Sequence, residues 1–196
     1  QRAYPCGQLV AENARRGRGE DEYELLDTGI FDGDRYFDLF VEYAKAGPED
    51  ILVRITAVNR GPEAADLHIL PTLWFRNDWA SWIAGSGAKP LIRQSQGPAG
   101  TSAMTAHHPL LGTYALYCDG DVPLLFTENE TNNARLFPKY PNPSPYVKDG
   151  INDYVLQGRH AAVSPEHQGT KASAHYRQMV GPGQSMTVRL RLTSQG

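Results

Sequence analysis

Few cysteines, no long apolar run and no excess of either charge are the first features of this 196-residue sequence. Its 19 Lys and Arg residues against 22 Asp and Glu give a formal net charge of -3, which argues against a dedicated binder of nucleic acid or of a membrane surface. No apolar run approaches the roughly 18 residues that a membrane-spanning helix needs. The two cysteines, Cys6 and Cys118, form neither a disulfide framework nor a zinc-ligand cluster, so we expect reduced thiols in a cytoplasmic protein.

Common catalytic and nucleotide-binding motifs are missing as well, including phosphate-binding loops, the dinucleotide fingerprint, the serine-hydrolase elbow and zinc-protease motifs. Six histidines are present, but none stands at ligand spacing with a second histidine and a carboxylate. We therefore expect no metal and no cofactor. The first residue is Gln1 rather than methionine and no signal-like stretch follows it, so we expect an excised piece of a longer protein.

Glycine and proline, by contrast, are abundant, with 19 and 14 residues, and they separate short segments in which apolar and polar residues alternate. This period of two is clearest over residues 36–43 and 186–192. Further strands are expected at 51–58, 66–75 (interrupted by Pro71), 114–117, 124–127, 153–156 and 172–179. No helical periodicity extends over ten or more residues. The pattern predicts one all-β domain over residues 1–196, an antiparallel β-sandwich with long loops at 76–109 and 135–150.

All three tryptophans, Trp74, Trp79 and Trp82, lie in one short segment that also contains Arg76 and Asn77. Sugars stack their C–H faces on aromatic rings and bond their hydroxyls to such polar side chains, so this segment is suited to carbohydrate. We expect Trp74 in the core. For Trp79 and Trp82 two roles stay open, contact with a sugar or anchoring of the loop that follows.

A second polar segment follows the strand expected at 124–127. Its carboxylates and amides are Glu128, Asn129, Glu130 and Asn132. Such groups bind hydroxyls or anchor a loop. A pair of carboxylates also suits glycoside hydrolysis, but neighbours on one strand cannot flank a sugar from both sides, so we assign no catalytic residue. Lys148 and Asp149, at the end of the proline-rich loop, are expected to form a surface pair or to contact a ligand.

Five stretches resemble bacterial glycoside hydrolases of family 63 and of the mannosylglycerate-hydrolase type: YELLDTG (23–29), RYFD (35–38), LPTLWFRN (70–77), LFTENETN (125–132) and GTKA (169–172). The resemblance implies the N-terminal supersandwich of such an enzyme, with a galactose-mutarotase-like fold. It also implies an inverting α-glycosidase whose acid and base lie in a C-terminal (α/α)6 barrel that this chain lacks. The implied role is an accessory domain that packs on the barrel and helps to shape its sugar site. The expected partners are that barrel and a carbohydrate, with neither nucleic acid nor membrane.

The candidate substrate-binding residues under this interpretation are Arg76, Asn77, Trp79, Trp82, Glu128, Asn129, Glu130, Asn132, Lys148 and Asp149. Two other functions remain open. The chain could be a stand-alone carbohydrate-binding module with Trp79 and Trp82 as its platform. It could also be a mutarotase-like sugar enzyme that uses His68 or His175 together with Glu128.

Overall fold

The computed structural model describes residues 4–79 and 88–194, and the chain forms two compact units. The first unit combines Gln1–Phe40, Ile55–Leu67 and Gln178–Thr187, and the second combines Val41–Arg54, His68–Arg177 and Val188–Gly196. Five strands have residues in both units: β1 (Phe37–Gly47), β2 (Asp50–Asn59), β3 (Ala65–Ile69), β11 (Tyr176–Val180) and β12 (Ser185–Ser194). The single domain expected over residues 1–196 remains a prediction.

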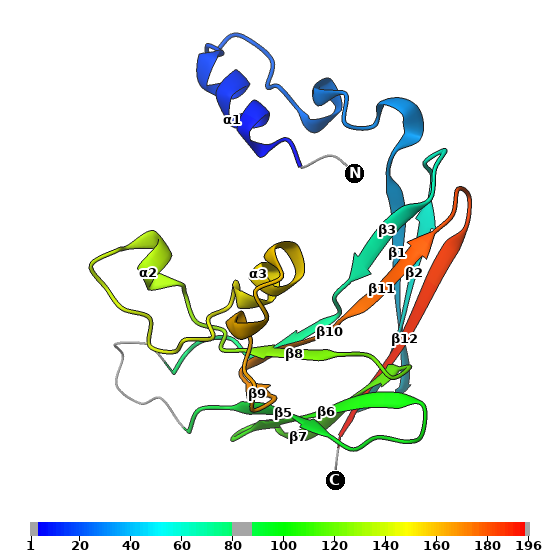
Figure 1. The fold of residues 1–196 in the computed structure, drawn as a ribbon, viewed down its shortest axis with the longest axis vertical. Coiled ribbons are helices and arrows are strands. Elements are labelled where there is room, and N and C mark those ends of the chain that lie inside the picture. Colours follow the sequence, from blue (N-terminus) through cyan, green and yellow to red (C-terminus); the bar gives the residue numbers. More distant parts are fainter. Residues whose placement is uncertain (1–3, 80–87, 195–196) are drawn as a thin grey trace. The chain divides into compact units, whose positions relative to one another are not determined.

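Helical segments lead the first unit (Figure 1). They are α1 (Cys6–Arg15) and the 3-10 helices η1 (Leu25–Thr28) and η2 (Asp32–Asp34). The ten residues of α1 correct the expectation that no helix of this length occurs. None of its residues is buried, and the apolar residues at helical spacing, Cys6, Leu9, Val10 and Ala14, extend over fewer than three turns. The unit also contains parts of β3 (Ala65–Ile69) and β11 (Tyr176–Val180), which form a two-stranded sheet.

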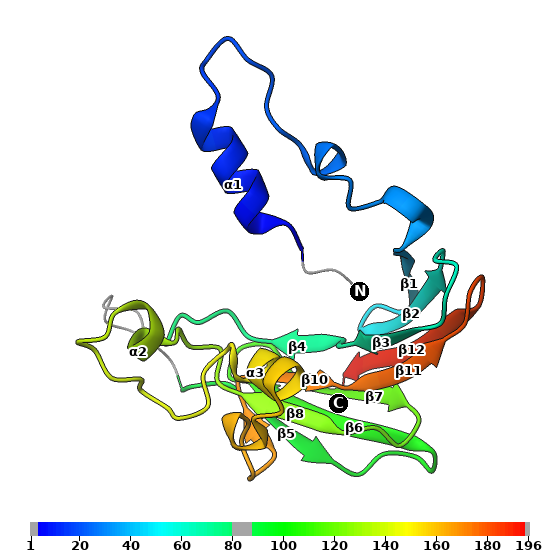
Figure 2. The ribbon, with the colours of Figure 1, turned by 45° about the horizontal axis from the view of Figure 1, so that its top comes forward.

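The second unit contains two sheets, and its fold is the expected all-β, antiparallel, sandwich-like one. The larger sheet has the strand order β1-β2-β12-β7-β6-β5-β9 and the smaller one the order β4-β10-β8. The strands not yet bounded are β4 (Thr72–Trp74), β5 (Leu91–Ser95), β6 (Thr101–His108), β7 (Gly112–Asp119), β8 (Leu124–Thr127), β9 (Gln168–Gly169) and β10 (Lys171–Ala174). The smaller sheet lies over β5, β6 and β7 (Figures 1 and 2). Ile92 on β5, Met104 on β6 and Phe126 on β8 are completely buried, as apolar side chains between two sheets should be.

The alternation read from the sequence is confirmed on β12. Val188 and Leu190 are buried, whereas Arg189 and Arg191 between and after them are exposed. β12 pairs with β7 in antiparallel register, with Leu190 opposite Cys118. The expected strand at 124–127 is confirmed as β8 with the same bounds.

Several other expectations for single elements were wrong. Residues 153–156 form part of a helix, α3 (Gly150–Gln157), and not a strand. The segment 76–109, expected as a loop, contains β5 and β6. Their many small and polar side chains do not give the alternation of apolar and polar residues that predicts a strand. Residues 66–75 divide at Leu70 and Pro71 into β3 and β4, because proline cannot donate to a strand ladder. Residues 172–179 divide at His175 into β10 and β11.

Trp74, expected in the core, is 56% exposed. It lies on β4, which is an edge strand of the smaller sheet. The remaining short helices are α2 (Asn133–Leu136) and the 3-10 helix η3 (His160–Ala162). Among the helices of the described ranges, none is both long and apolar enough to cross a membrane.

Candidate functional site

A polar cluster lies at the end of the smaller sheet, where β4 and β8 stop. It consists of Trp79, Lys89, Glu128, Glu130 and Thr170, and is called the Glu130 cluster below. The middle strand β10 brings the two strand ends together, because Lys171 pairs with both Trp74 and Thr127. The segments that follow β4 and β8 therefore begin side by side, although they are far apart in the sequence.

Asn129 fastens these two segments to one another. Its side-chain Nδ2 donates to the carbonyl oxygen of Phe75 over 2.8 Å, and its own carbonyl oxygen accepts from Nδ2 of Asn77 over 3.0 Å. Its backbone N–H donates to Oγ1 of Thr170 over 2.7 Å. The structure thus brings the two predicted amides, Asn77 and Asn129, into one site, where both join strand ends.

Lys89 is the centre of charge in the Glu130 cluster. Its Nζ lies 3.0 Å from Oε2 of Glu128 and 3.2 Å from Oε1 of Glu130. Burial lowers the pKa of the Lys89 ammonium, but the hydrogen bonds and charges of the two carboxylates outweigh it and raise that pKa above its ordinary value. Two carboxylates share one ammonium, which leaves the cluster with an excess negative charge.

Glu130 is buried, and its two carboxylate oxygens differ in their surroundings. Oε1 accepts hydrogen bonds from the indole Nε1 of Trp79 over 3.0 Å and from Lys89. Oε2 is buried too, but within the described part of the chain it has no hydrogen-bond partner. A buried carboxylate oxygen without a donor is costly, so this atom suits the hydroxyl or amine of a ligand.

Two members of the cluster, Thr170 and Lys89, were missed by sequence reasoning. The Thr170 hydroxyl donates to Oε2 of Glu128 over 2.7 Å, and the residue is 1% exposed. It belongs to the stretch GTKA at 169–172, which was singled out for its resemblance alone. Lys89 lies in the segment expected to be a loop, and only the fold brings it to the two glutamates.

The remaining acidic candidate, Asp149, belongs to a second polar group. Its two carboxylate oxygens each accept from Nδ2 of Asn132 over 3.1 Å, and Oδ2 also lies 3.2 Å from Nη1 of Arg135. The expected pair of Lys148 with Asp149 is absent from the described ion pairs, because Arg135 takes that place and Lys148 Nζ instead donates to Thr131 over 3.4 Å. These bonds tie α2 to the start of α3.

Two predicted residues do not join either group. The Arg76 side chain is exposed, and in the part of the chain that the structure describes its guanidinium makes no hydrogen bond or ion pair. Trp82 lies outside the described residues. Trp79, the other proposed platform residue, has its indole N–H engaged by Glu130 and the Lys89 ammonium 5.6 Å from its ring centroid.

The histidines considered for mutarotase-like chemistry are distant from Glu128 along the strands. Nδ1 of His68 and Nε2 of His175 share a hydrogen bond of 2.8 Å. The backbone N–H of His175 bonds to Pro123 before β8 begins, whereas Glu128 follows its last residue. His175 and Glu128 thus lie at opposite ends of β8 and do not form one site. Among residues 4–79 and 88–194, no group of three or more His, Cys, Asp and Glu side chains could hold a metal ion.

The chain is similar to part of a longer yeast protein. No protein-family model matches the chain. Over 223 aligned residues, the chain is 35% identical to the uncharacterized protein YMR196W of Saccharomyces cerevisiae (strain ATCC 204508 / S288c). The alignment covers 99% of this chain but 20% of the yeast protein. The chain therefore spans about a fifth of the length of the relative that it matches.

Proposed function

We propose that this chain is an accessory β-sandwich domain of an enzyme that hydrolyses α-glycosides, of the inverting glucosidase or mannosylglycerate-hydrolase type. In this proposal the domain packs on an (α/α)6 barrel of the same polypeptide and shapes the sugar site of that barrel. The alignment with about a fifth of a longer yeast protein is consistent with one domain of a larger enzyme.

The observation that carries the proposal is the meeting of three separate stretches at one end of the smaller sheet. The stretches 70–77, 125–132 and 169–172, which resemble the glycosidases, contain or adjoin β4, β8 and β10. These are the three strands of one sheet, and the Glu130 cluster lies where they end. Three of the five similar stretches therefore meet at one polar sheet end, as expected of a domain that borders a sugar site.

Glu130 supplies the chemistry for this role. Its Oε2 is a buried acceptor with no donor in the described part of the chain, and a sugar hydroxyl can serve as that donor once a neighbouring group moves aside. The neighbouring Oε1 is held by Trp79 and Lys89, so the free oxygen has a fixed position. A rigidly held acceptor costs little further ordering when a ligand binds.

The stand-alone carbohydrate-binding module is less well supported. A sugar platform needs an exposed aromatic face, but Lys89 lies over the ring of Trp79 and Glu130 engages its N–H. This arrangement fits an anchored loop better than a stacking surface.

The proposal is tested on the full-length protein that contains this chain. We expect turnover of p-nitrophenyl α-glucoside, α-linked glucose disaccharides or mannosylglycerate by the full-length protein, and none by the isolated chain. Within the full-length protein, Glu130→Gln should raise KM about three- to tenfold, the effect of one lost hydrogen bond. Glu63→Gln is the matched control, because Glu63 is exposed and bonded to Arg35 in the first unit.

Turnover by the isolated chain would contradict the accessory role. A full-length protein that hydrolyses none of these substrates would contradict the glycosidase assignment. An unchanged KM in the Glu130→Gln variant would remove Glu130 from the sugar site.

A further inference from the structure

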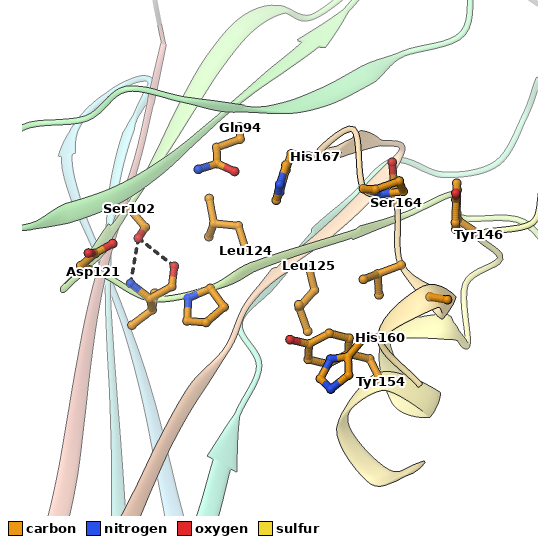
Figure 3. A pocket seen from close by; sticks show the side chains of 15 residues that line it. Gln94, Ser102, Asp121, Leu124, Leu125, Tyr146, Tyr154, His160, Ser164 and His167 are labelled. Carbon is orange, nitrogen blue, oxygen red and sulfur yellow. Dashed lines mark hydrogen bonds between the residues drawn. The ribbon is translucent and has the colours of Figure 1, made fainter. Parts of the chain in front are cut away.

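A pocket of about 710 Å³ opens in the second unit beside the first half of β8 (Figure 3). It shares no lining residue with the Glu130 cluster. Gln94 on β5 and His167 lie on one side of it, and Tyr154 on α3 and His160 on η3 lie on the other, with Leu124 and Leu125 of β8 between them (Figure 3). The volume is within the roughly 300–1,000 Å³ typical of small-ligand sites.

Ser102 in the lining bonds through its hydroxyl to the backbone of Val122, but five other polar side chains of this pocket are unpaired within the described chain. Among the residues that the structure describes, no hydrogen bond or ion pair engages the side chains of Gln94, Tyr146, Tyr154, His160 or His167. Amide, imidazole and phenol groups each donate and accept hydrogen bonds. Gln94, His160 and His167 are exposed and can exchange water for a ligand, whereas Tyr146 and Tyr154 are half-buried.

Two of these side chains are held in place through their rings, so their polar atoms stay available. The ring of Tyr154 packs edge-on against His160 with centroids 4.7 Å apart, and the ring of His167 does so against Phe126 at 6.2 Å. His167 has a φ of 52°, in the left-handed region that non-glycine residues rarely adopt. Its carbonyl oxygen accepts from the backbone N–H of Gln94 over 2.9 Å, which fixes this conformation. Backbone strain of this kind concentrates at ligand sites.

The charge of the lining decides the class of ligand. The residues around the pocket include no lysine or arginine that could neutralise a phosphate or carboxylate, and Asp121 is the single carboxylate among them. Leu125, Val163 and Pro165 add apolar surface beside the free polar groups. An uncharged ligand with many hydroxyls and apolar C–H faces matches this lining.

We propose that this pocket is a binding site for a neutral mono- or disaccharide, held by hydrogen bonds to Gln94, Tyr154, His160 and His167. The site is separate from the Glu130 cluster and does not rest on the proposed function, since a sugar can bind here whether or not a full-length enzyme is a glycosidase.

The test is a titration of the 196-residue chain with maltose, glucose and methyl α-mannoside, followed by amide NMR shifts and calorimetry. We expect shifts centred on Leu125, Ser164 and His167 with millimolar affinity. Tyr154→Phe removes one hydroxyl, and His167→Asn removes the imidazole while keeping a residue that tolerates positive φ. Each should weaken binding about three- to tenfold. Tyr140→Phe makes the same change as Tyr154→Phe on an exposed loop residue and should leave the affinity unchanged.

Absence of shifts with all three sugars up to about 50 mM, well above millimolar dissociation constants, would overturn the proposal. So would shifts confined to the Glu130 cluster, or an unchanged affinity in both pocket variants. Titration with inorganic phosphate serves as the counter-probe, and binding of phosphate at this pocket would overturn its assignment to neutral ligands. Spectra of each variant without ligand establish that it is folded.

Discussion

Gly169 passes so close to Thr127 that a β-carbon on it would lie 2.3 Å from the Thr127 carbonyl oxygen. A contact this short with a backbone atom cannot be relieved by a side-chain rotation. Gly169→Ala should therefore separate β8 from β9 and lower the free energy of unfolding by about 1–3 kcal/mol, as overpacking does. Urea denaturation followed by circular dichroism measures the change.

Gly7→Ala is the control for that substitution. Gly7 lies in α1, and a β-carbon there would have no heavy atom within 4 Å. Because alanine favours helix over glycine, this variant should be as stable as the parent or more so. Equal stability of the Gly169→Ala variant and the parent would contradict the close approach of Gly169 to Thr127.

Lys89 should stabilise the second unit through its two carboxylate partners. Its side chain is 42% exposed, so solvent screening limits the effect of Lys89→Met to about 1 kcal/mol. Because the folded-state pKa of Lys89 is raised, this stabilisation is fully present below about pH 10 and is lost as the pH rises through the folded-state pKa. The measurement is the difference in unfolding free energy between parent and variant from pH 7 to 11.

Lys45→Met is the matched control, since Lys45 is exposed and makes no described ion pair. A Lys89→Met difference that grows with alkaline pH would contradict the sign of the pKa shift. A difference no larger than that of Lys45→Met would show that the bridge between the two glutamates does not stabilise the fold.

The two cysteines should differ sharply in reactivity. Neither forms a disulfide, Cys6 is exposed and Cys118 is completely buried. Burial raises the pKa of the Cys118 thiol to about 12, and the thiolate is the reactive form. Under native conditions at pH 8, a thiol reagent should modify Cys6 alone, and Cys118 should react after addition of denaturant. Mass spectrometry of the labelled peptides distinguishes the sites, and native labelling of Cys118 would contradict its burial.

The strands predicted from the sequence are those in which burial alternates along the chain. On β12 the core requires an apolar residue at every second position, so the pattern of Val188 and Leu190 against Arg189 and Arg191 was visible. On β6, Ala103, Met104 and Ala106 are buried. Adjacent buried positions such as Ala103 and Met104 give no alternation, so β6 resembled a loop.

The short helix α3 was not predicted from the sequence for a related reason. Only Gly150 and Ile151 are buried in α3, and a helix of eight residues with two buried positions has no detectable period. The polar site was predicted in part, because Glu128, Glu130, Asn77 and Asn129 follow recognisable strands. Lys89 could not be found in this way, because its contacts with the two glutamates depend on how the strands are ordered in space.

Thr127 and Thr170, neighbours at the end of the smaller sheet, provide a matched pair of substitutions. Both are almost completely buried, but the Thr170 hydroxyl donates to Glu128 and accepts from the backbone of Asn129. The Thr127 hydroxyl is without a hydrogen-bond partner in the described ranges. Valine has the shape of threonine without the hydroxyl, so Thr170→Val should cost about 1–3 kcal/mol, because the Asn129 N–H loses its acceptor and Oε2 of Glu128 keeps Lys89 alone.

Thr127→Val should be neutral or stabilising, because it replaces a buried unpaired hydroxyl with a methyl group. Thermal and urea unfolding of both variants give the comparison, and the sign of the difference between them is the decisive quantity. If Thr127→Val destabilises as much as Thr170→Val, the Thr127 hydroxyl has a partner such as an ordered water, and the cluster extends one residue further into β8. If Thr170→Val destabilises the fold and Thr127→Val does not, the hydrogen-bonded cluster at this sheet end does not include Thr127.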